Sequence, residues 1–238
     1  MKKIDFTDLI LFENTDFIAI NKPPGISTLE DRKVETNLLN IAKNSYPDIQ
    51  VCHRIDKDTS GVLVFAKNPT GYRHLSLQFQ NRQVKKIYHA VVYGKSEFRD
   101  KLIDIPLIEK NNNMVIWDVK AGKESMTFFT TLENYTFSSL IACRPISGRK
   151  HQIRVHLKYI KHPIIADQIY SGENVYLSQL KKNYKSNQRT ENPLINRMAL
   201  HSFSISFKTL KDHEQTIEAP YPKDFVILLK QLRKYSNI

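Results

Sequence analysis

A polar stretch of nine residues runs directly into five apolar ones in the first third of the chain. Residues 53–61 read His-Arg-Ile-Asp-Lys-Asp-Thr-Ser-Gly, and residues 62–66 read Val-Leu-Val-Phe-Ala. A short apolar run that follows a Gly turn predicts a buried strand. The loop before this strand then holds Asp56 between a basic pair and a hydroxyl-rich turn. A carboxylate there can stay ionised, because cationic neighbours favour its charged form.

The remaining patterns predict more strands than helices, without a strand–helix–strand rhythm. Strands are expected in residues 10–20 (two, around an Asn-Thr-Asp turn), 87–93, several places within 101–141, and 199–207. Helices are expected after the N-caps Thr36 and Thr70, over 151–160 and over 223–235. We therefore expect an α+β fold with a mixed, largely antiparallel central sheet and flanking helices, in one domain spanning residues 1–238. The polar residues 173–196 predict a long insertion or mobile loop.

The composition predicts a soluble protein of a reducing cytoplasm. Of the 238 residues, 41% are hydrophobic and 25% charged, as in ordinary globular proteins. No apolar run approaches the roughly 18 residues that span a bilayer. Asp5 and Asp8 interrupt the basic start of the chain, which argues against a signal peptide. Cys52 and Cys143 form no C-x-x-C pair, so a disulfide framework is not expected.

The excess of positive charge lies in two stretches of the sequence that contain no acidic residue. The chain carries 36 Lys and Arg against 24 Asp and Glu, a net charge of +12. Residues 59–96 and 134–166 contain no Asp or Glu, yet together they carry 12 basic side chains. A surface without carboxylates suits a polyanion. The alternative is a generally basic protein with solvated lysines.

Three segments resemble one known family in the right order. The string 53–61 resembles the H-R-L-D-x-x-T-S-G motif of the RluA-type RNA pseudouridine synthases, with Ile55 in place of Leu. The segment Lys86-Ile-Tyr-His-Ala90 is similar to K-x-Y-x-A, and residues 147–157 are similar to T-G-R-T-H-Q-I-R-V-H-L. Weaker likenesses are found at 21–25 (N-K-P-x-G), 162–170 (H-P-I-x-G-D-x-x-Y, with Ala166 for Gly) and 197–202 (R-L-A-L-H-A).

The resemblance implies a pseudouridine synthase catalytic fold and assigns roles to individual residues. Asp56 would be the catalytic nucleophile, Tyr88 would stack on the target base, and Arg154 would pair with Asp56. The expected RNA contacts are Arg54, which would fill the space of the flipped nucleotide, Leu200 against the base, and Lys22, Lys86, Arg149 and Lys150 on phosphates. Asp58 gains no role from the resemblance and is interpreted as a turn residue.

The implied reaction is isomerisation of specific uridines to pseudouridine in structured RNA, either tRNA or ribosomal RNA. It involves no redox change and no transfer to water, so we expect no cofactor and no metal. RNA is the expected partner of a monomeric protein that does not bind membranes. The N-K-P-P-G segment begins at residue 21, which leaves no room for the N-terminal RNA-binding extension common in the family. This favours tRNA slightly, and RNA recognition by the catalytic domain itself.

Other chemistries find little support. The seven glycines form neither G-x-G-x-x-G nor a Walker A string, and His151 and His156 are not spaced as an i, i+4 metal pair. The remaining alternative is a catalytically silent RNA-binding or RNA-folding protein on the same scaffold. Replacing Asp56 by Asn separates the two, because an enzyme would lose product formation and keep RNA binding.

Overall fold

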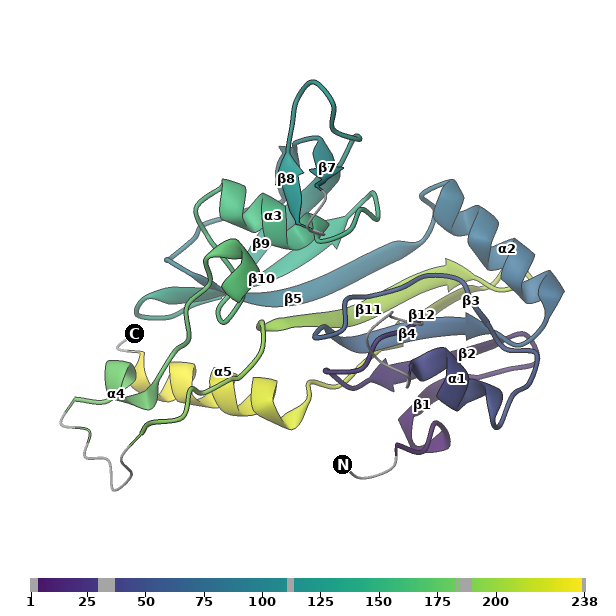
Figure 1. The fold of residues 1–238 in the computed structure, drawn as a ribbon, viewed down its shortest axis with the longest axis horizontal. Coiled ribbons are helices and arrows are strands. Elements are labelled where there is room, and N and C mark those ends of the chain that lie inside the picture. Colours follow the sequence, from purple (N-terminus) through teal and green to yellow (C-terminus); the bar gives the residue numbers. More distant parts are fainter. Residues whose placement is uncertain (1–3, 30–36, 111–113, 183, 185–189, 237–238) are drawn as a thin grey trace. The chain divides into compact units, whose positions relative to one another are not determined.

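The computed structural model describes residues 4–29, 37–110, 114–182, 184 and 190–236, and these residues form two compact units (Figure 1). Unit 1 comprises Met1–Ile87 and His201–Pro220, and unit 2 comprises Tyr88–Leu200 and Tyr221–Ile238. The expectation of one catalytic domain stays a prediction.

Unit 1 is built on a sheet whose centre is the predicted strand of residues 62–66. Its strands are β1 (Ile10–Glu13), β2 (Phe17–Lys22), β3 (Gln50–Val51), β4 (Ser60–Ala66), β11 (Leu200–Lys208) and β12 (Glu214–Glu218). The order is β1-β2-β4-β11, with β12 paired to β11 and β3 to β4. β4 and β11 are parallel, whereas the other ladders of this sheet are antiparallel.

Helices cover both faces of β4, because neighbouring side chains of a strand point to opposite sides. Val62 and Val64 lie in one core with Leu75 of α2 (Pro69–Gln80). Leu63 lies in a second core with Leu38 of α1 (Leu38–Lys43). All seven residues of β4 are buried, which confirms the predicted buried strand.

Asparagines, and not the expected threonines, begin the two helices of unit 1. The side chain of Asn68 accepts the N–H of Gly71 at 2.8 Å, so the prediction that Thr70 caps α2 is wrong. Asn37 caps α1 in the same way by accepting the N–H of Asn40 at 2.9 Å. The predicted cap Thr36 lies outside the described residues. An Asn amide oxygen is among the best acceptors for the unpaired N–H groups of a first helical turn.

Unit 2 contains an antiparallel sheet in the order β5-β10-β9-β6. Its strands are β5 (Lys85–Tyr93, whose first three residues belong to unit 1), β6 (Lys101–Asp104), β9 (Met126–Asn134) and β10 (Ser138–Pro145). β7 (Leu107–Glu109) and β8 (Val115–Trp117) form a separate two-stranded sheet. The expected α+β class with a largely antiparallel sheet is therefore confirmed.

Two predicted helices contribute to the core of unit 2. α3 (Gln152–Tyr159) brings Ile153 and Leu157 into this core, and α5 (Lys223–Tyr235) brings Phe225 and Leu228. The structure thus confirms the helices expected over 151–160 and 223–235. In the described part of the chain, no helix is long and apolar enough to cross a membrane.

The segment expected to be a polar loop contains ordered structure in its described part. The short helix α4 (Leu177–Leu180) lies within it, and Val175 and Ile195 are fully buried in the core of unit 2. The few apolar residues of this segment are separated by polar ones and form no run or period long enough to predict this packing. Residues 183 and 185–189 lie outside the described residues.

Candidate active site

Asp56 lies half-buried in the loop between β3 and β4 of unit 1. The N–H of Thr59 donates to the carbonyl oxygen of Asp56 at 3.1 Å and closes a tight turn. Arg54 and Asp58, two residues to either side, are exposed to solvent. The turn fixes the backbone at the carboxylate while leaving the guanidinium of Arg54 on the surface.

A second segment, residues 22–28, holds this loop in place. The carbonyl oxygen of Lys57 accepts two hydrogen bonds of 2.9 Å each, from the N–H of Gly25 and from Nζ of Lys22. The hydroxyl of Thr28 donates to the carbonyl oxygen of Ile55 at 3.3 Å. The residues on both sides of Asp56 are therefore hydrogen-bonded to the turn that ends β2.

Lys22 is a structural residue in this unit, which argues against its predicted contact with a phosphate. The side chain is completely buried, and Nζ donates to the carbonyl oxygens of Pro23 (3.0 Å), Ile26 (2.9 Å) and Lys57 (2.9 Å). An ammonium has three N–H donors, and three backbone acceptors use them. The prolines at 23 and 24 have no backbone N–H to donate, and the ammonium of Lys22 supplies hydrogen-bond donors at this turn instead.

After the Asp56 loop, the first two residues of β4, Ser60 and Gly61, are held against β11. Gly61 has a φ of +109°, and a Cβ at this position would lie 2.1 Å from the carbonyl oxygen of Ser202 on β11. The buried His201 bonds the carbonyl oxygen of Ala219 through Nε2 at 3.0 Å. Its Nδ1 can then accept the hydroxyl of Ser60, which is 2.9 Å away. Gly61 and Ser60 thus attach the loop closely to β11.

His53 is neutral, so it does not contribute a charge to the basic pair expected beside Asp56. Its Nε2 accepts the N–H of Val64 at 3.0 Å, and its ring stacks on Phe79 with 4.7 Å between centroids. Burial, together with the nearby charge of Lys86, lowers the pKa of His53 to about 3. The ring nitrogen thus accepts a β4 backbone N–H in the way that a carbonyl oxygen of a neighbouring strand would.

Lys86 is a half-buried cation of unit 1. Its Nζ lies 6.0 Å from the centre of the Phe79 ring, and burial lowers its pKa to about 8. Among the described residues, it forms no ion pair. An ammonium in this state would gain from the arrival of a phosphate.

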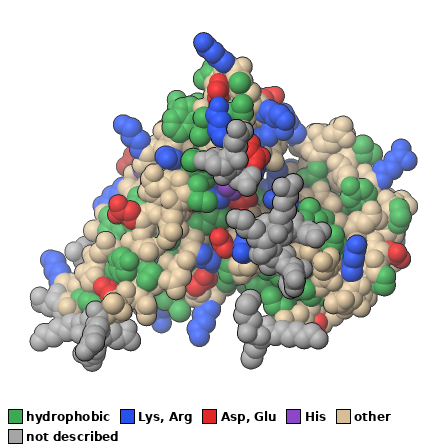
Figure 2. Space-filling model, viewed as in Figure 1, with side chains coloured by type: hydrophobic (Ala, Val, Ile, Leu, Met, Phe, Trp, Pro, Cys, Tyr) green, Lys and Arg blue, Asp and Glu red, His purple; other side chains and the backbone are tan. Residues whose placement is uncertain are grey.

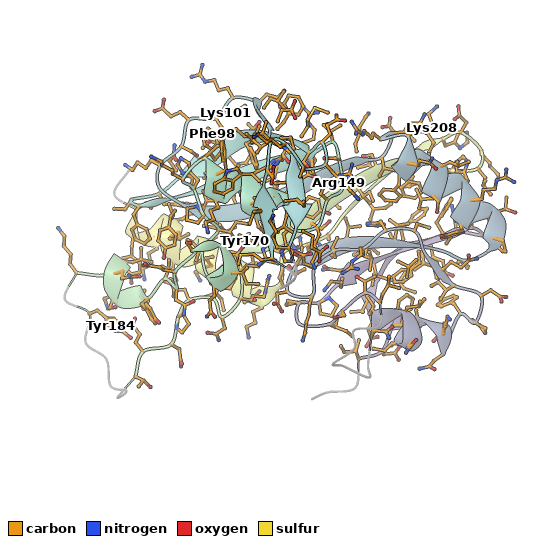
Figure 3. The ribbon with its side chains drawn as sticks, turned by 45° about the horizontal axis from the view of Figure 1, so that its top comes forward. Phe98, Lys101, Arg149, Tyr170, Tyr184 and Lys208 are labelled. Atoms are coloured by element: carbon orange, nitrogen blue, oxygen red, sulfur yellow. The ribbon has the colours of Figure 1, made fainter. Side chains whose placement is uncertain are left out.

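In unit 2, Arg154 forms a buried ion pair with Asp167. Nε of Arg154 donates to Oδ2 of Asp167 at 2.7 Å and Nη2 donates to Oδ1 at 2.8 Å, and the two side chains are 6% and 1% exposed. The guanidinium lies 4.8 Å from the centre of the ring of Tyr170, on η2 (Gln168–Tyr170; Figure 3). We did not predict a role for Asp167. The available signal was its position as the first acid after the acid-free residues 134–166.

The other expected site residues of unit 2 differ in accessibility. Tyr88 is half-buried on β5, whereas Leu200 is 3% exposed and belongs to the core, so it offers a base little surface. Arg149 is exposed at the start of α3, where its Nε donates to the carbonyl oxygen of Glu124 at 3.3 Å (Figure 3). Nζ of Lys150 is bonded to Glu109, which argues against its expected phosphate contact.

The acid-free stretches of sequence are not acid-free in space. Within the described ranges, at least five of their 12 basic side chains form ion pairs with acids from elsewhere in the same unit. These pairs are Lys67–Glu13, Lys85–Glu214, Arg144–Asp100, Lys150–Glu109 and Arg154–Asp167. The expected carboxylate-free surface is therefore smaller than the sequence indicated.

The expected site residues are divided between the two units. Unit 1 holds Asp56, Arg54 and Lys86, and unit 2 holds Tyr88 and Arg154. The pairing of Asp56 with Arg154 and its proximity to Tyr88 stay predictions. Within the described ranges, no three His, Cys, Asp or Glu side chains are grouped so that they could hold a metal ion.

Comparison with known proteins identifies the class. The model of the RNA pseudouridylate synthase family matches residues 16–159, which include the Asp56 loop and α3. The chain therefore belongs to this family and is an RNA pseudouridine synthase of the RluA type.

Individual relatives agree with this assignment. The chain is 37% identical to ribosomal large subunit pseudouridine synthase C of Buchnera aphidicola subsp. Baizongia pistaciae, over 96% of this chain and 72% of that protein. It is 35% identical to dual-specificity RNA pseudouridine synthase RluA of Vibrio parahaemolyticus, over 87% and 80%. The solved structure of human RNA pseudouridylate synthase domain containing 4 is similar with a TM-score of 0.77, at 25% identity over 96% and 94%.

Proposed function

We propose that this protein isomerises specific uridines in ribosomal or transfer RNA and that Asp56 performs the chemistry. The observation that carries the proposal is the attachment of the Asp56 loop, whose neighbouring carbonyls bind Lys22, Gly25 and Thr28. A catalytic group must be held near its reacting atom, and such a backbone frame supplies the rigidity.

The reaction breaks the bond between the ribose carbon and uracil N1, turns the base, and forms a bond from the same carbon to uracil C5. The proton that leaves C5 is balanced by one gained at N1, so the net change is an isomerisation. Asp56 would act on the sugar as a nucleophile or as a proton acceptor. Both alternatives need the ionised carboxylate.

The uridine must leave its stack before Asp56 can reach the sugar, at a cost of a few kcal/mol. We propose that Arg54 fills the space it leaves, a role supported by its exposure two residues before Asp56. Tyr88 would stack on the uracil, which contributes about 1–3 kcal/mol. Arg154 would direct its guanidinium at Asp56, with Asp167 fixing its orientation in unit 2.

Lys86 and Arg149 are the phosphate contacts that we retain. Lys86 has no carboxylate partner among the described residues, and Arg149 is exposed. The burial of Lys22 and the ion pair of Lys150 with Glu109 argue against the other two lysines. Replacing a true phosphate contact should lower the salt dependence of RNA binding by about one unit of log–log slope.

Ribosomal RNA of the large subunit is the first substrate to test, because the relatives named above include a ribosomal large subunit enzyme. The dual-specificity relative makes tRNA the second substrate. Both would be met in the reducing cytoplasm expected for this chain.

The test maps pseudouridine by its carbodiimide adducts in ribosomal RNA and tRNA from a strain that lacks the gene, before and after incubation with the protein. Wild-type protein should restore discrete sites, and Asp56→Asn should restore none while still binding RNA. Asp58→Asn is the matched control, because it makes the same change in the same loop and should retain activity. Absence of product with wild-type protein on both RNAs would leave the silent RNA-binding alternative as the better account.

A further inference from the structure

An exposed aromatic pair on the surface of unit 2 has no role in the proposal above. Trp117 on β8 and Tyr159 on α3 meet edge to face, with ring centroids 5.4 Å apart and an interplanar angle of 73°. Each side chain is 43% exposed. Among the described residues, neither the indole N–H nor the Tyr159 hydroxyl has a hydrogen-bond partner.

The pair is presented by a fixed frame. Two positions before Trp117, Val115 is buried, and one helical turn before Tyr159, Val155 is buried with it in the same small core. The N–H of Val115 also donates to the hydroxyl of Tyr170 at 3.0 Å. A strand repeats its facing every two residues and a helix about every four. Trp117 therefore lies on the same face of β8 as Val115, and Tyr159 on the same face of α3 as Val155. The buried contact between the valines continues to the surface as the contact between the two rings.

Lysines lie close to the two rings in the sequence, and the ammonium of Lys158 lies 5.9 Å from the centre of the Tyr170 ring. The flanking lysines are Lys120 and Lys123 after β8, and Lys158 and Lys161 on either side of Tyr159. Among the described residues, none of these four forms an ion pair. The one acid that adjoins Trp117 is Asp118, and its Oδ1 accepts the N–H groups of Lys120 and Ala121 within its own turn. Over β7 and β8, Figure 2 shows blue Lys and Arg side chains and green hydrophobic ones, with red Asp and Glu side chains among them.

We propose that Trp117 and Tyr159 form a docking surface for an unpaired base of the RNA substrate, in addition to the residues assigned to the reaction. Aromatic rings among lysines are the means by which proteins hold single strands: the bases stack and the lysines neutralise phosphates. A protein partner would be expected to find a larger apolar surface than these two rings. This inference depends on RNA being the substrate and adds the place where a flanking nucleotide binds.

The chain supplies its own probe, because Trp117 is its single tryptophan. Titration with a short single-stranded oligoribonucleotide should quench the intrinsic fluorescence saturably. An abasic ribose-phosphate oligomer of equal charge should quench much less. Equal quenching by the two would show that the surface reads charge alone and would overturn the proposal.

Variants measured with labelled RNA give the second arm. Trp117→Ala should raise the Kd for the RNA about 5- to 150-fold, the equivalent of about 1–3 kcal/mol of stacking. Tyr159→Ala should weaken binding as well, and Trp117→Phe less than Trp117→Ala. Tyr72→Ala is the matched control, since Tyr72 is 39% exposed on α2 of unit 1. An unchanged Kd in Trp117→Ala, with unchanged thermal unfolding, would overturn the proposal.

Two further measurements separate this inference from the proposed catalysis. Asp56→Asn should show the wild-type fluorescence change without forming pseudouridine, and Trp117→Ala should regain turnover at saturating RNA. Product formation without any quenching would overturn the proposed docking surface and leave the proposed catalytic function standing. A wild-type dimer in sedimentation that Trp117→Ala converts to monomer would assign the rings to contact between copies and overturn the proposal.

Discussion

Arg154 and Asp167 form a bidentate ion pair inside unit 2, with N–O distances of 2.7 and 2.8 Å. The pair changes how the expected role of Arg154 is understood. A guanidinium already balanced by a carboxylate adds little net charge for Asp56, but it is held in one orientation. Arg154 is then better described as a fixed hydrogen-bond donor than as a source of positive potential.

Asp167→Asn should destabilise the protein strongly, because the Arg154 charge would remain buried without its counter-charge. Removing one partner of a buried pair costs about 3–5 kcal/mol, and urea unfolding measures it. Asp212→Asn is the control: its pair with Lys208 is exposed at the surface and should contribute little. If both substitutions lower the unfolding free energy equally, the buried pair contributes no more to stability than the exposed one, which contradicts the prediction.

Lys22→Met should reduce activity through the Asp56 loop and not through RNA binding. The substitution keeps the length of the side chain and removes the donor for three backbone carbonyls, of which that of Ile26 is buried, at a cost of about 1–3 kcal/mol. We expect kcat to fall, while the Kd for RNA and the salt slope of binding stay unchanged. Arg149→Ala, an exposed cation, should lower the salt slope and leave kcat at saturation unaffected. A lowered salt slope in Lys22→Met would restore its interpretation as a phosphate contact.

The sequence was sufficient for the fold class, the strand of residues 62–66, and the helices of residues 151–160 and 223–235. Each has a strong local signal: an unbroken apolar run for the strand and apolar side chains at helical spacing for the helices. The caps were misplaced because Asn and Thr both favour such positions and lie next to each other at 36–37 and two residues apart at 68 and 70. Position alone decided which of them caps.

The site was less predictable, because its charges are settled by contacts between distant residues. The sequence around Lys22 indicates a surface cation, whereas in the structure three backbone carbonyls surround its ammonium. Lys150 looked free within an acid-free stretch, but Glu109 comes from 41 residues away in the chain. His53 looked like a cation beside Asp56 and is instead neutral. Local sequence carries no record of such partners.

Lys86 should make RNA binding depend on pH near 8. Burial lowers its pKa to about 8, so the ammonium that would attract a phosphate loses its proton as the pH rises through this value. We expect the Kd for RNA to increase between about pH 7 and 9 in the wild type. In Lys86→Met, the Kd should be higher at pH 7 and vary less. Fluorescence anisotropy of labelled RNA measures both, and parallel pH curves would contradict the prediction.

Lys86 should also cost stability at neutral pH. Its pKa is lower in the folded state than the usual 10.5, so the unfolded chain binds more protons between about pH 8 and 10.5. Stability should rise with pH across this window as far as Lys86 is concerned. Lys86→Met should therefore be more stable than wild type at pH 7, and the difference should shrink towards pH 10. A difference that does not change with pH would mean that the ammonium is well solvated.

His53 should make the fold sensitive to acid. Its pKa of about 3 lies below the usual 6.5, because burial, and to a lesser extent Lys86, disfavours the charged ring. The unfolded chain binds more protons between about pH 3 and 6.5, so the stability that depends on His53 is complete above pH 6.5 and is lost as the pH falls through this window. Protonation at Nε2 would also remove the acceptor of the Val64 N–H. His53→Gln, which keeps an acceptor without a titrating ring, should flatten the pH dependence of the unfolding free energy between pH 4 and 6.5. It should leave the pH dependence of turnover unchanged, since His53 is assigned no proton transfer. A shifted pH–rate profile in this variant would instead place His53 among the groups that take part in the reaction.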